Sequence, residues 1–160
     1  MNVGEFYFLK DSFSADMNDP RIMRNKPPDQ YGRPRDRPYC IGYIEPNTGI
    51  FWMSPVSSEI IKFRGIYDNT IQKRGKCDTI RFYKINGNER AFLIQNMVPV
   101  TQAYIKNGYL NRAGEPIRLS DFSTTDFSNT TRKVLHLIEN GSFRIFTDAL
   151  RIKQQLLPSP

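Results

Sequence analysis

The stretch from Arg37 to Lys62, RPYCIGYIEPNTGIFWMSPVSSEIIK, predicts a strand, a tight turn, a second strand and the start of a helix. Residues 38–45 and 50–56 are rich in apolar and β-branched residues. The turn 46–49, Pro-Asn-Thr-Gly, contains Asn and Gly, which accept the positive φ angles of tight hairpin turns. The chain is therefore expected to be organised around an antiparallel hairpin that leads into a helix.

The end of this hairpin carries polar residues beside the expected helix. Ser57 or Ser58 can cap the helix, Glu59 favours its first turn through the helix dipole, and the pattern continues to about Lys73. Pro55 cannot donate a ladder hydrogen bond, so it is expected at a strand end or on a sheet edge.

The flanking chain supports a small sheet covered by helices. Further strands are predicted at 5–10, 79–85 and 90–98, with an Asn86-Gly87 hairpin turn, and helices at 100–106, 125–139 and 147–156. Residues 11–36 are polar and rich in Pro and Gly, which predicts a long loop. Residues 109–119 predict a small hairpin or extension. The sequence predicts one domain over residues 1–160, with an α+β fold: a compact antiparallel, barrel-like sheet with peripheral helices.

The net charge of +7 favours a polyanionic partner. Of the 160 residues, 39% are hydrophobic, which is enough for a real core. No stretch approaches the roughly 20 apolar residues of a membrane helix. With no visible secretion signal, Cys40 and Cys77 are expected to be reduced and the protein cytoplasmic.

Much of the positive charge precedes the hairpin, in the predicted loop. Tyr31 interrupts this basic run, and basic side chains around an aromatic ring suit a phosphate backbone with a stacked base. The basic residues of the loop are Arg21, Arg24, Lys26, Arg33, Arg35 and Arg37.

The residue types also limit the chemistry. The sequence shows no clustered metal ligands and no phosphate-binding glycine motif, so no metal and no cofactor are expected. The one histidine, His136, lies within a predicted helix, and its role stays open. RNA transesterification requires only positive charge and hydroxyl or amide donors around a phosphate. Ser57, Ser58 and Lys62 surround a helix start, where a phosphate binds well.

Several motifs resemble the endoribonuclease toxins of type III toxin–antitoxin systems, the ToxN/AbiQ superfamily, most closely the CptN and TenpN branches. The most specific are WMSP-V-SS-x3-K and LIQNM-x-P. The matching pieces are FYFLKD at 6–11, NK at 25–26, RPY at 37–39, GIFWMSPVSSEIIKF at 49–63, KCD at 76–78 and FLIQNMVPVTQAYI at 92–105.

The resemblance implies a barrel related to the MazF/PemK fold and metal-independent cleavage of cellular or phage RNA. The products would carry a cyclic phosphate and a 5′-hydroxyl. It further implies inhibition by a small structured antitoxin RNA, such as a pseudoknot, which the toxin cuts from repeats and which joins several toxin chains. A non-catalytic RNA-binding barrel and a MazF-like nuclease with a protein antitoxin are the alternatives.

By the same resemblance, Ser57, Ser58 and Lys62 belong to the catalytic site. The upstream cation is either Lys26 or Arg37, and a tyrosine, Tyr7 or Tyr31, contributes. Arginine would stabilise charge but would not readily shuttle protons. The predicted RNA-binding residues are Arg21, Arg24, Tyr31, Arg33, Arg35, Arg64, Lys73, Arg74, Lys76, Gln95 and Asn96.

Overall fold

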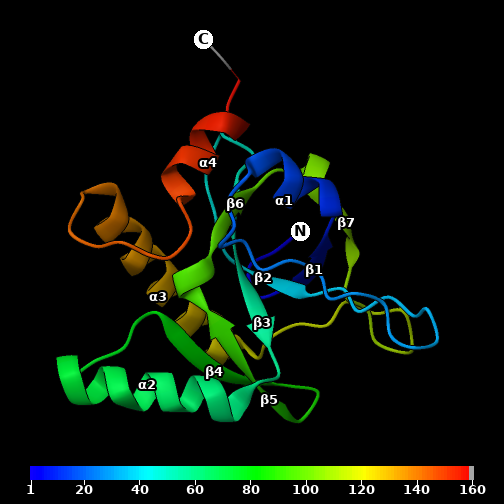
Figure 1. Ribbon diagram of the computed structural model, residues 1–160, viewed down its shortest axis with the longest axis horizontal. Coiled ribbons are helices and arrows are strands. Elements are labelled where there is room, and N and C mark those ends of the chain that lie inside the picture. The colour runs from blue at the N-terminus through cyan, green and yellow to red at the C-terminus, as the bar shows by residue number, and fades with distance from the viewer. Residues whose placement is uncertain (159–160) are drawn as a thin grey trace.

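Seven strands and four α-helices make up the fold in a computed structural model that describes residues 1–158 (Figure 1). The strands are β1 (Phe6–Leu9), β2 (Pro38–Ile44), β3 (Phe51–Ser57), β4 (Ile80–Ile85), β5 (Asn88–Leu93), β6 (Val98–Val100) and β7 (Ile105–Gly108). The α-helices are α1 (Asp11–Met17), α2 (Ile60–Arg74), α3 (Asp121–Glu139) and α4 (Ala149–Leu156), with 3₁₀ turns η1 (Ile94–Asn96) and η2 (Gln102–Tyr104). The predicted α+β fold with an antiparallel sheet is confirmed.

All seven strands join one antiparallel sheet in the order β4-β5-β3-β2-β1-β7, and β6 also pairs with β3. One edge of β3 pairs with β2 over residues 51–55. The other edge pairs first with β6, at residues 51–53, and then with β5, at residues 56–57. Strand β3 therefore holds together the two halves of the sheet.

Pro55 lies inside β3 rather than at its end. It pairs with Tyr39 of β2, and on the opposite edge it falls between the residues that pair with β6 and those that pair with β5. A residue without an N–H breaks no ladder at that position, which is why a proline is tolerated within a central strand.

The segment after β1 corrects the prediction of a continuous loop over 11–36. Helix α1 starts at Asp11, and its residues Phe13 and Met17, one helical turn apart, are both buried in the core. Asn18 ends the helix in the left-handed conformation, with φ 47°. Two apolar residues at i,i+4 spacing were the available signal, and tertiary burial makes this short helix stable.

Residues 90–98 were predicted as one strand, and the structure divides them. Strand β5 ends at Leu93, the η1 turn follows, and β6 begins at Val98. This break lets one apolar segment pair with both halves of β3. Similarly, the predicted helix at 100–106 is only the η2 turn followed by β7, which closes onto β1.

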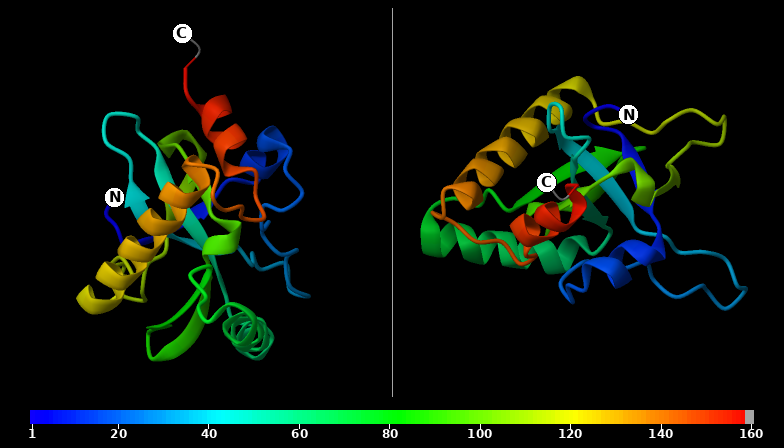
Figure 2. Two further views of the ribbon diagram at one scale, coloured as in Figure 1. Left: turned by 90° about the vertical axis from the view of Figure 1, so that its left-hand side faces the viewer. Right: turned by 90° about the horizontal axis from the view of Figure 1, so that it is seen from above.

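The helices lie outside the sheet and enclose its apolar faces (Figures 1 and 2). Trp52, Tyr39 and Phe92 are among the largest fully buried side chains.

Helix α3 starts at Asp121, four residues earlier than predicted, because Ser120 caps it by accepting a hydrogen bond from the Ser123 N–H. Its predicted apolar face, formed by Phe127, Thr131, Val134, Leu135 and Ile138, is buried as expected. Among residues 1–158, no helix has the length and hydrophobicity needed to cross a bilayer.

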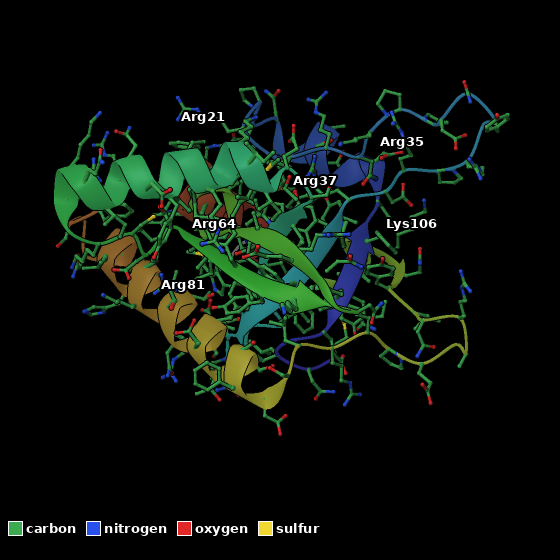
Figure 3. The ribbon with its side chains drawn as sticks, turned by 90° about the horizontal axis from the view of Figure 1, so that it is seen from below. Arg21, Arg35, Arg37, Arg64, Arg81 and Lys106 are labelled. Carbon is green, nitrogen blue, oxygen red and sulfur yellow. The ribbon has the colours of Figure 1, made fainter. Side chains whose placement is uncertain are left out.

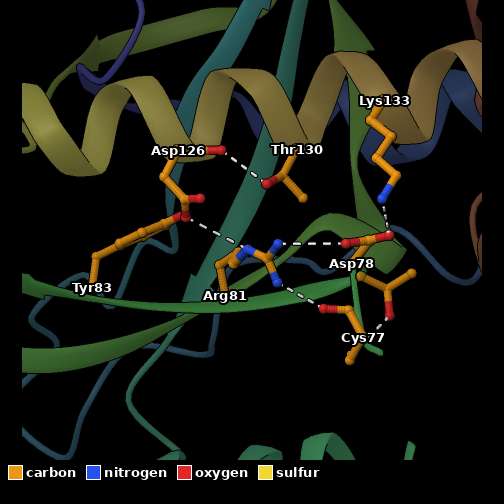
Figure 4. Close-up of polar contacts among 8 residues, drawn as sticks. Cys77, Asp78, Arg81, Tyr83, Asp126, Thr130 and Lys133 are labelled. Carbon is orange, nitrogen blue, oxygen red and sulfur yellow. Dashed lines mark hydrogen bonds and ion pairs between the residues drawn. The ribbon is translucent and has the colours of Figure 1, made fainter. Parts of the chain in front are cut away.

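A network of charged side chains fastens α3 to β4 (Figure 4). The Arg81 guanidinium contacts Asp78 at 3.4 Å and Asp126 of α3 at 3.5 Å. Lys133 of α3 pairs with Asp78 at 2.8 Å, and the Tyr83 hydroxyl donates to Asp126 at 2.6 Å. Burial and this carboxylate raise the pKa of Tyr83, so it stays a neutral donor.

Replacing Gly42 with alanine should destabilise the protein, because α3 crosses β2 at this glycine. A Cβ at position 42 would lie 2.3 Å from the Thr131 Oγ1 and 2.9 Å from its Cβ. Overpacking of this kind costs about 1–3 kcal/mol. We expect urea denaturation of Gly42→Ala to show a loss of that size.

Gly65→Ala on the exposed side of α2 is the matched control. A Cβ at position 65 meets no atom within 4 Å, so the alanine should stabilise the protein by about 0.5–1 kcal/mol. Equal stability of Gly42→Ala and the wild type would show that α3 does not pack against β2 this closely.

Candidate nucleic-acid-binding groove

A groove of about 310 Å³ lies where the two halves of the sheet meet. Four parts of the chain form it: the segment before β2, the end of β3, the β4–β5 hairpin and the residue after β7. Its polar lining comprises Lys26, Arg35, Asp36, Arg37, Ser57, Ser58, Asn86, Asn88, Arg90 and Tyr109. Figure 3 shows Arg35, Arg37 and Lys106 on this side of the molecule.

The end of β3 brings two hydroxyls to the start of α2. Ser57 pairs with Ala91 of β5 and is 4% exposed, whereas Ser58 is exposed. Neither serine is the N-cap residue that the sequence predicts. Glu59 holds that position, and the Ser57 Oγ accepts a hydrogen bond from the Glu59 N–H at 3.2 Å. The positive end of the α2 dipole therefore lies beside the groove.

Arg37 is held rigidly beside the end of β3. Its Nη1 donates to the Val56 carbonyl at 3.1 Å and its Nε to the Arg24 carbonyl at 3.4 Å. Its backbone N–H donates to the Asn25 side chain at 2.8 Å. A guanidinium fixed in this way places its charge next to the serines at little further cost in side-chain entropy.

The segment before β2 is an ordered arm that projects from the sheet (Figures 1 and 3). Lys26 and Arg35 form an antiparallel bridge at its base. At its tip, Asp29 accepts hydrogen bonds from the backbone N–H groups of Tyr31 and Arg33 and from the Arg33 side chain. The bond from the Arg33 N–H is the largest cause of the lowered pKa of Asp29. Tyr31 is 73% exposed, and the Arg33 guanidinium lies 5.1 Å from the centre of its ring.

The negative charge of the Asp36 carboxylate in the groove lining is balanced by a neighbouring lysine. Asp36 forms an ion pair with Lys106 of β7 at 2.6 Å, and this hydrogen bond raises the pKa of Lys106. The other charged side chains of the lining are cations: Lys26, Arg35, Arg37 and Arg90. The charges of the lining are therefore mostly positive, and its hydroxyl and amide groups can donate hydrogen bonds to the oxygens of an anion such as phosphate.

Five polar residues of the groove lining were not predicted as site residues: Asp36, Asn86, Asn88, Arg90 and Tyr109. The Asn86-Gly87 turn is predicted correctly, but the alternation within a strand does not say what its two faces contact. The position of the hairpin beside the end of β3 brings Asn86, Asn88 and Arg90 into the groove, whereas Tyr109 reaches it from the end of β7.

Two predicted catalytic residues lie outside the lining. Lys62 is exposed on α2, because the neighbouring Phe63 is the residue that packs against the sheet. Tyr7 donates its hydroxyl to Glu5 at 2.6 Å, and Glu5 in turn pairs with Arg118. Lys62 and Tyr7 therefore do not line the groove with the two serines.

Most of the other predicted RNA-binding residues are also outside the groove. Arg64 pairs with Glu89 and lies over the Phe82 ring. Lys73, Arg74 and Gln95 line a separate hollow of about 660 Å³ at the far end of α2. Arg21 donates to the Phe146 carbonyl, and Asn96 donates to the Arg21 carbonyl. Arg24 and Lys76 are exposed outside the groove lining.

Gln95 and Asn96 are both buried, at 8% exposure, in the η1 turn. The Asn96 amide donates to the Arg21 carbonyl at 3.1 Å, and Gln95 lines the hollow at the far end of α2. His136 is exposed on α3, away from the groove lining. Within residues 1–158, no three His, Cys, Asp or Glu side chains are placed to hold a metal ion.

No protein-family model and no curated protein matches this chain. A chain in a solved structure described as "A processed non-coding RNA regulates a bacterial antiviral system" is similar, with a TM-score of 0.66. The two chains are 12% identical over 95% of this chain and 96% of the other. At this identity the likeness shows a shared fold and nothing more.

The hydrogen bond between half-buried Tyr7 and buried Glu5 makes the stability of the protein depend on pH in the alkaline range. Burial, and next the hydrogen bond to Glu5, raise the pKa of Tyr7 to about 12. The pKa of an unfolded tyrosine is about 10. The stabilisation that comes from neutral Tyr7 is complete below pH 10, and it is lost as the pH rises from about 10 through about 12.

In Tyr7→Phe, the free energy of unfolding should fall less steeply with pH over this interval. Urea denaturation at several pH values from about 9 to 12 would measure it. Tyr39 and Tyr83, whose pKa values burial also raises, remain in both proteins, so the difference reports Tyr7. Parallel curves for the two proteins would contradict the assigned bond.

Proposed function

We propose that this chain is the endoribonuclease toxin of a type III toxin–antitoxin system and that the groove cleaves RNA. The observation that carries the proposal is the meeting of Lys26, Arg37 and Arg90 with two serine hydroxyls beside a helix N-terminus. The ToxN-like fold and the motifs shared with the CptN and TenpN branches add to it.

In the proposed reaction, the 2′-hydroxyl gives its proton to solvent and attacks the adjacent phosphorus. The bond from phosphorus to the 5′-oxygen breaks, and that oxygen takes a proton from the Lys26 ammonium, which solvent then restores. The products are a 2′,3′-cyclic phosphate and a 5′-hydroxyl. Negative charge grows on the non-bridging phosphate oxygens in the transition state, and preorganised cations and donors stabilise it. Arg37, Arg90 and the serine hydroxyls are the groups proposed to do so, without a metal or cofactor.

The two candidates for the upstream cation have different roles in this proposal. Arg37 is fixed by two backbone carbonyls and remains charged, so it stabilises the phosphate. Lys26 is exposed at the rim, and an amine can exchange a proton.

Lys62 is proposed to act from the first turn of α2. Helix side chains tilt toward the helix N-terminus, so a change of rotamer brings its ammonium toward Ser58.

The proposed inhibitor is a small structured RNA, a pseudoknot processed from repeats, which joins several toxin chains in a cytoplasmic complex active in phage defence. The similar solved structure concerns an antiviral system regulated by a processed non-coding RNA, which supports an RNA partner. The projecting basic arm, with Tyr31 at its tip, offers a contact outside the groove. Within this proposal, residues 1–160 form a single toxin domain.

Cleavage in EDTA is the decisive test. We expect purified, RNA-free protein to cut RNA and leave cyclic phosphate and 5′-hydroxyl ends. Arg37→Ala and Ser57→Ala should each lower the rate about 100-fold or more, the usual cost of losing a transition-state donor. Arg132→Ala, on α3 outside the groove, is the control and should cut at the wild-type rate.

The outcomes separate the alternatives. RNA binding without new ends would indicate a non-catalytic RNA-binding barrel, and no binding by a folded protein would contradict the proposal. Repeats of a short RNA element upstream of the coding sequence would support an RNA antitoxin. A small upstream reading frame would instead support a protein antitoxin and a MazF-like nuclease.

The salt dependence of binding tests whether Arg90 contacts a phosphate. Each cation that neutralises a phosphate of single-stranded RNA contributes about 0.7 to the slope of log K against log salt. With a short labelled RNA whose 2′-hydroxyls are methylated to prevent cleavage, Arg90→Ala should reduce the slope by about that amount. Fluorescence anisotropy between about 50 and 200 mM salt would measure it. An unchanged slope would remove Arg90 from the phosphate site, and Arg132→Ala again serves as control.

A further inference from the structure

The β4–β5 hairpin extends past the core, and its inner face becomes one wall of the groove. Tyr83 pairs with Arg90, and Ile85 pairs with Asn88. Near the core this face carries the buried Phe92, and toward the turn it carries Arg90 and Asn88. The opposite face packs against α2 through Ala91 and Leu93. Because side chains alternate along a strand, one face of β5 lies in the core beneath α2 and the other face lines the groove.

The wall differs chemically from the cationic side of the groove. Beyond Arg90 it carries Ile85 and the amides Asn86 and Asn88, with Tyr109 beside them. Each amide offers two N–H donors and a carbonyl acceptor, which suits the mixed donor and acceptor edge of a nucleobase. One side-chain N–H of Asn88 donates to the backbone carbonyl of Asn86, at 3.3 Å. The second N–H and the side-chain oxygen of Asn88 take no part in that bond.

Tyr109 is held in place at the end of this wall. Its backbone N–H donates to the Phe6 carbonyl at 2.9 Å, and its carbonyl accepts from the Ile117 N–H at 2.9 Å. Its ring centroid lies 5.2 Å from that of Phe8, at an interplanar angle of 52°. The ring is partly exposed where it meets the groove. A fixed, partly exposed aromatic ring is a stacking surface for an unpaired base.

We propose that this wall reads one unpaired RNA base next to the scissile phosphate. Asn86 and Asn88 bond to the edge of the base, Tyr109 stacks on its face, and Arg90 holds the adjoining phosphate. The groove volume, about 310 Å³, is at the lower end of small-molecule sites, so it admits about one nucleotide. This inference rests on the proposed function and adds the residues that select where the RNA is cut.

Mapping cut ends in an RNA library of random sequence tests the inference. We expect wild-type protein to show a base preference at one position beside the cut. Asn88→Ala and Asn86→Gly should each reduce that preference about tenfold, the usual contribution of a paired base contact, while cutting continues. Glycine is chosen at position 86 because Asn86 has φ 50°, which glycine adopts without strain.

Lys84→Ala is the matched control, because Lys84 is exposed on the opposite face of the same hairpin. It should leave the preference unchanged. Tyr109→Phe should retain the wild-type preference through stacking, and Tyr109→Leu should lower the cutting rate at preferred sites.

Two results would overturn the inference while the proposed function stands. One is an unchanged base preference in both asparagine variants. The other is complete loss of cleavage by folded Asn88→Ala, which would place the residue in the chemical step instead of in base reading. A wild-type protein that makes no cuts would overturn the proposed function and this inference together.

Discussion

Strand β3 pairs with three other strands, and the rest of the structure depends on the hydrogen bonds of this one strand to all three. One edge of the strand bonds to β2, and the other bonds to β6 and then to β5. The sheet must therefore diverge at residues 54–55, between the two partners. Pro55 lies at that point, where a missing N–H costs no hydrogen bond. Ser57, the last residue of β3, lines the groove there, and Val56 before it lies between the groove and the core.

The positive charge of the groove follows from the same constraint. The carbonyl of Val56, beside the divergence, accepts a hydrogen bond from Arg37 and so positions a cation next to Ser57. Arg90 comes from the strand that pairs with this end of β3. Arg37 lies here because its guanidinium donates to the Val56 carbonyl, and Arg90 lies here because the hairpin wall extends past the core.

The local pattern of the sequence was sufficient for the elements that depend on neighbours along the chain. The hairpin of β2 and β3, the Asn86-Gly87 turn and the buried face of α3 all follow from turn chemistry and periodicity. The errors concern segments whose structure depends on distant partners. Helix α1 forms because Phe13 and Met17 are buried by the rest of the core. The break between β5 and β6 forms because both halves of β3 need a partner.

The sequence by itself determined that the chain is basic, that it folds as a small antiparallel sheet with helices, and that two serines precede a helix start. These are local or compositional properties. Only the tertiary structure decided which other side chains line the groove with the serines. It brings in the cations Lys26, Arg37 and Arg90, and it leaves Lys62 and Tyr7 outside the groove lining. The physical reason is that strand pairing across the chain, and not spacing along it, sets which side chains share a surface.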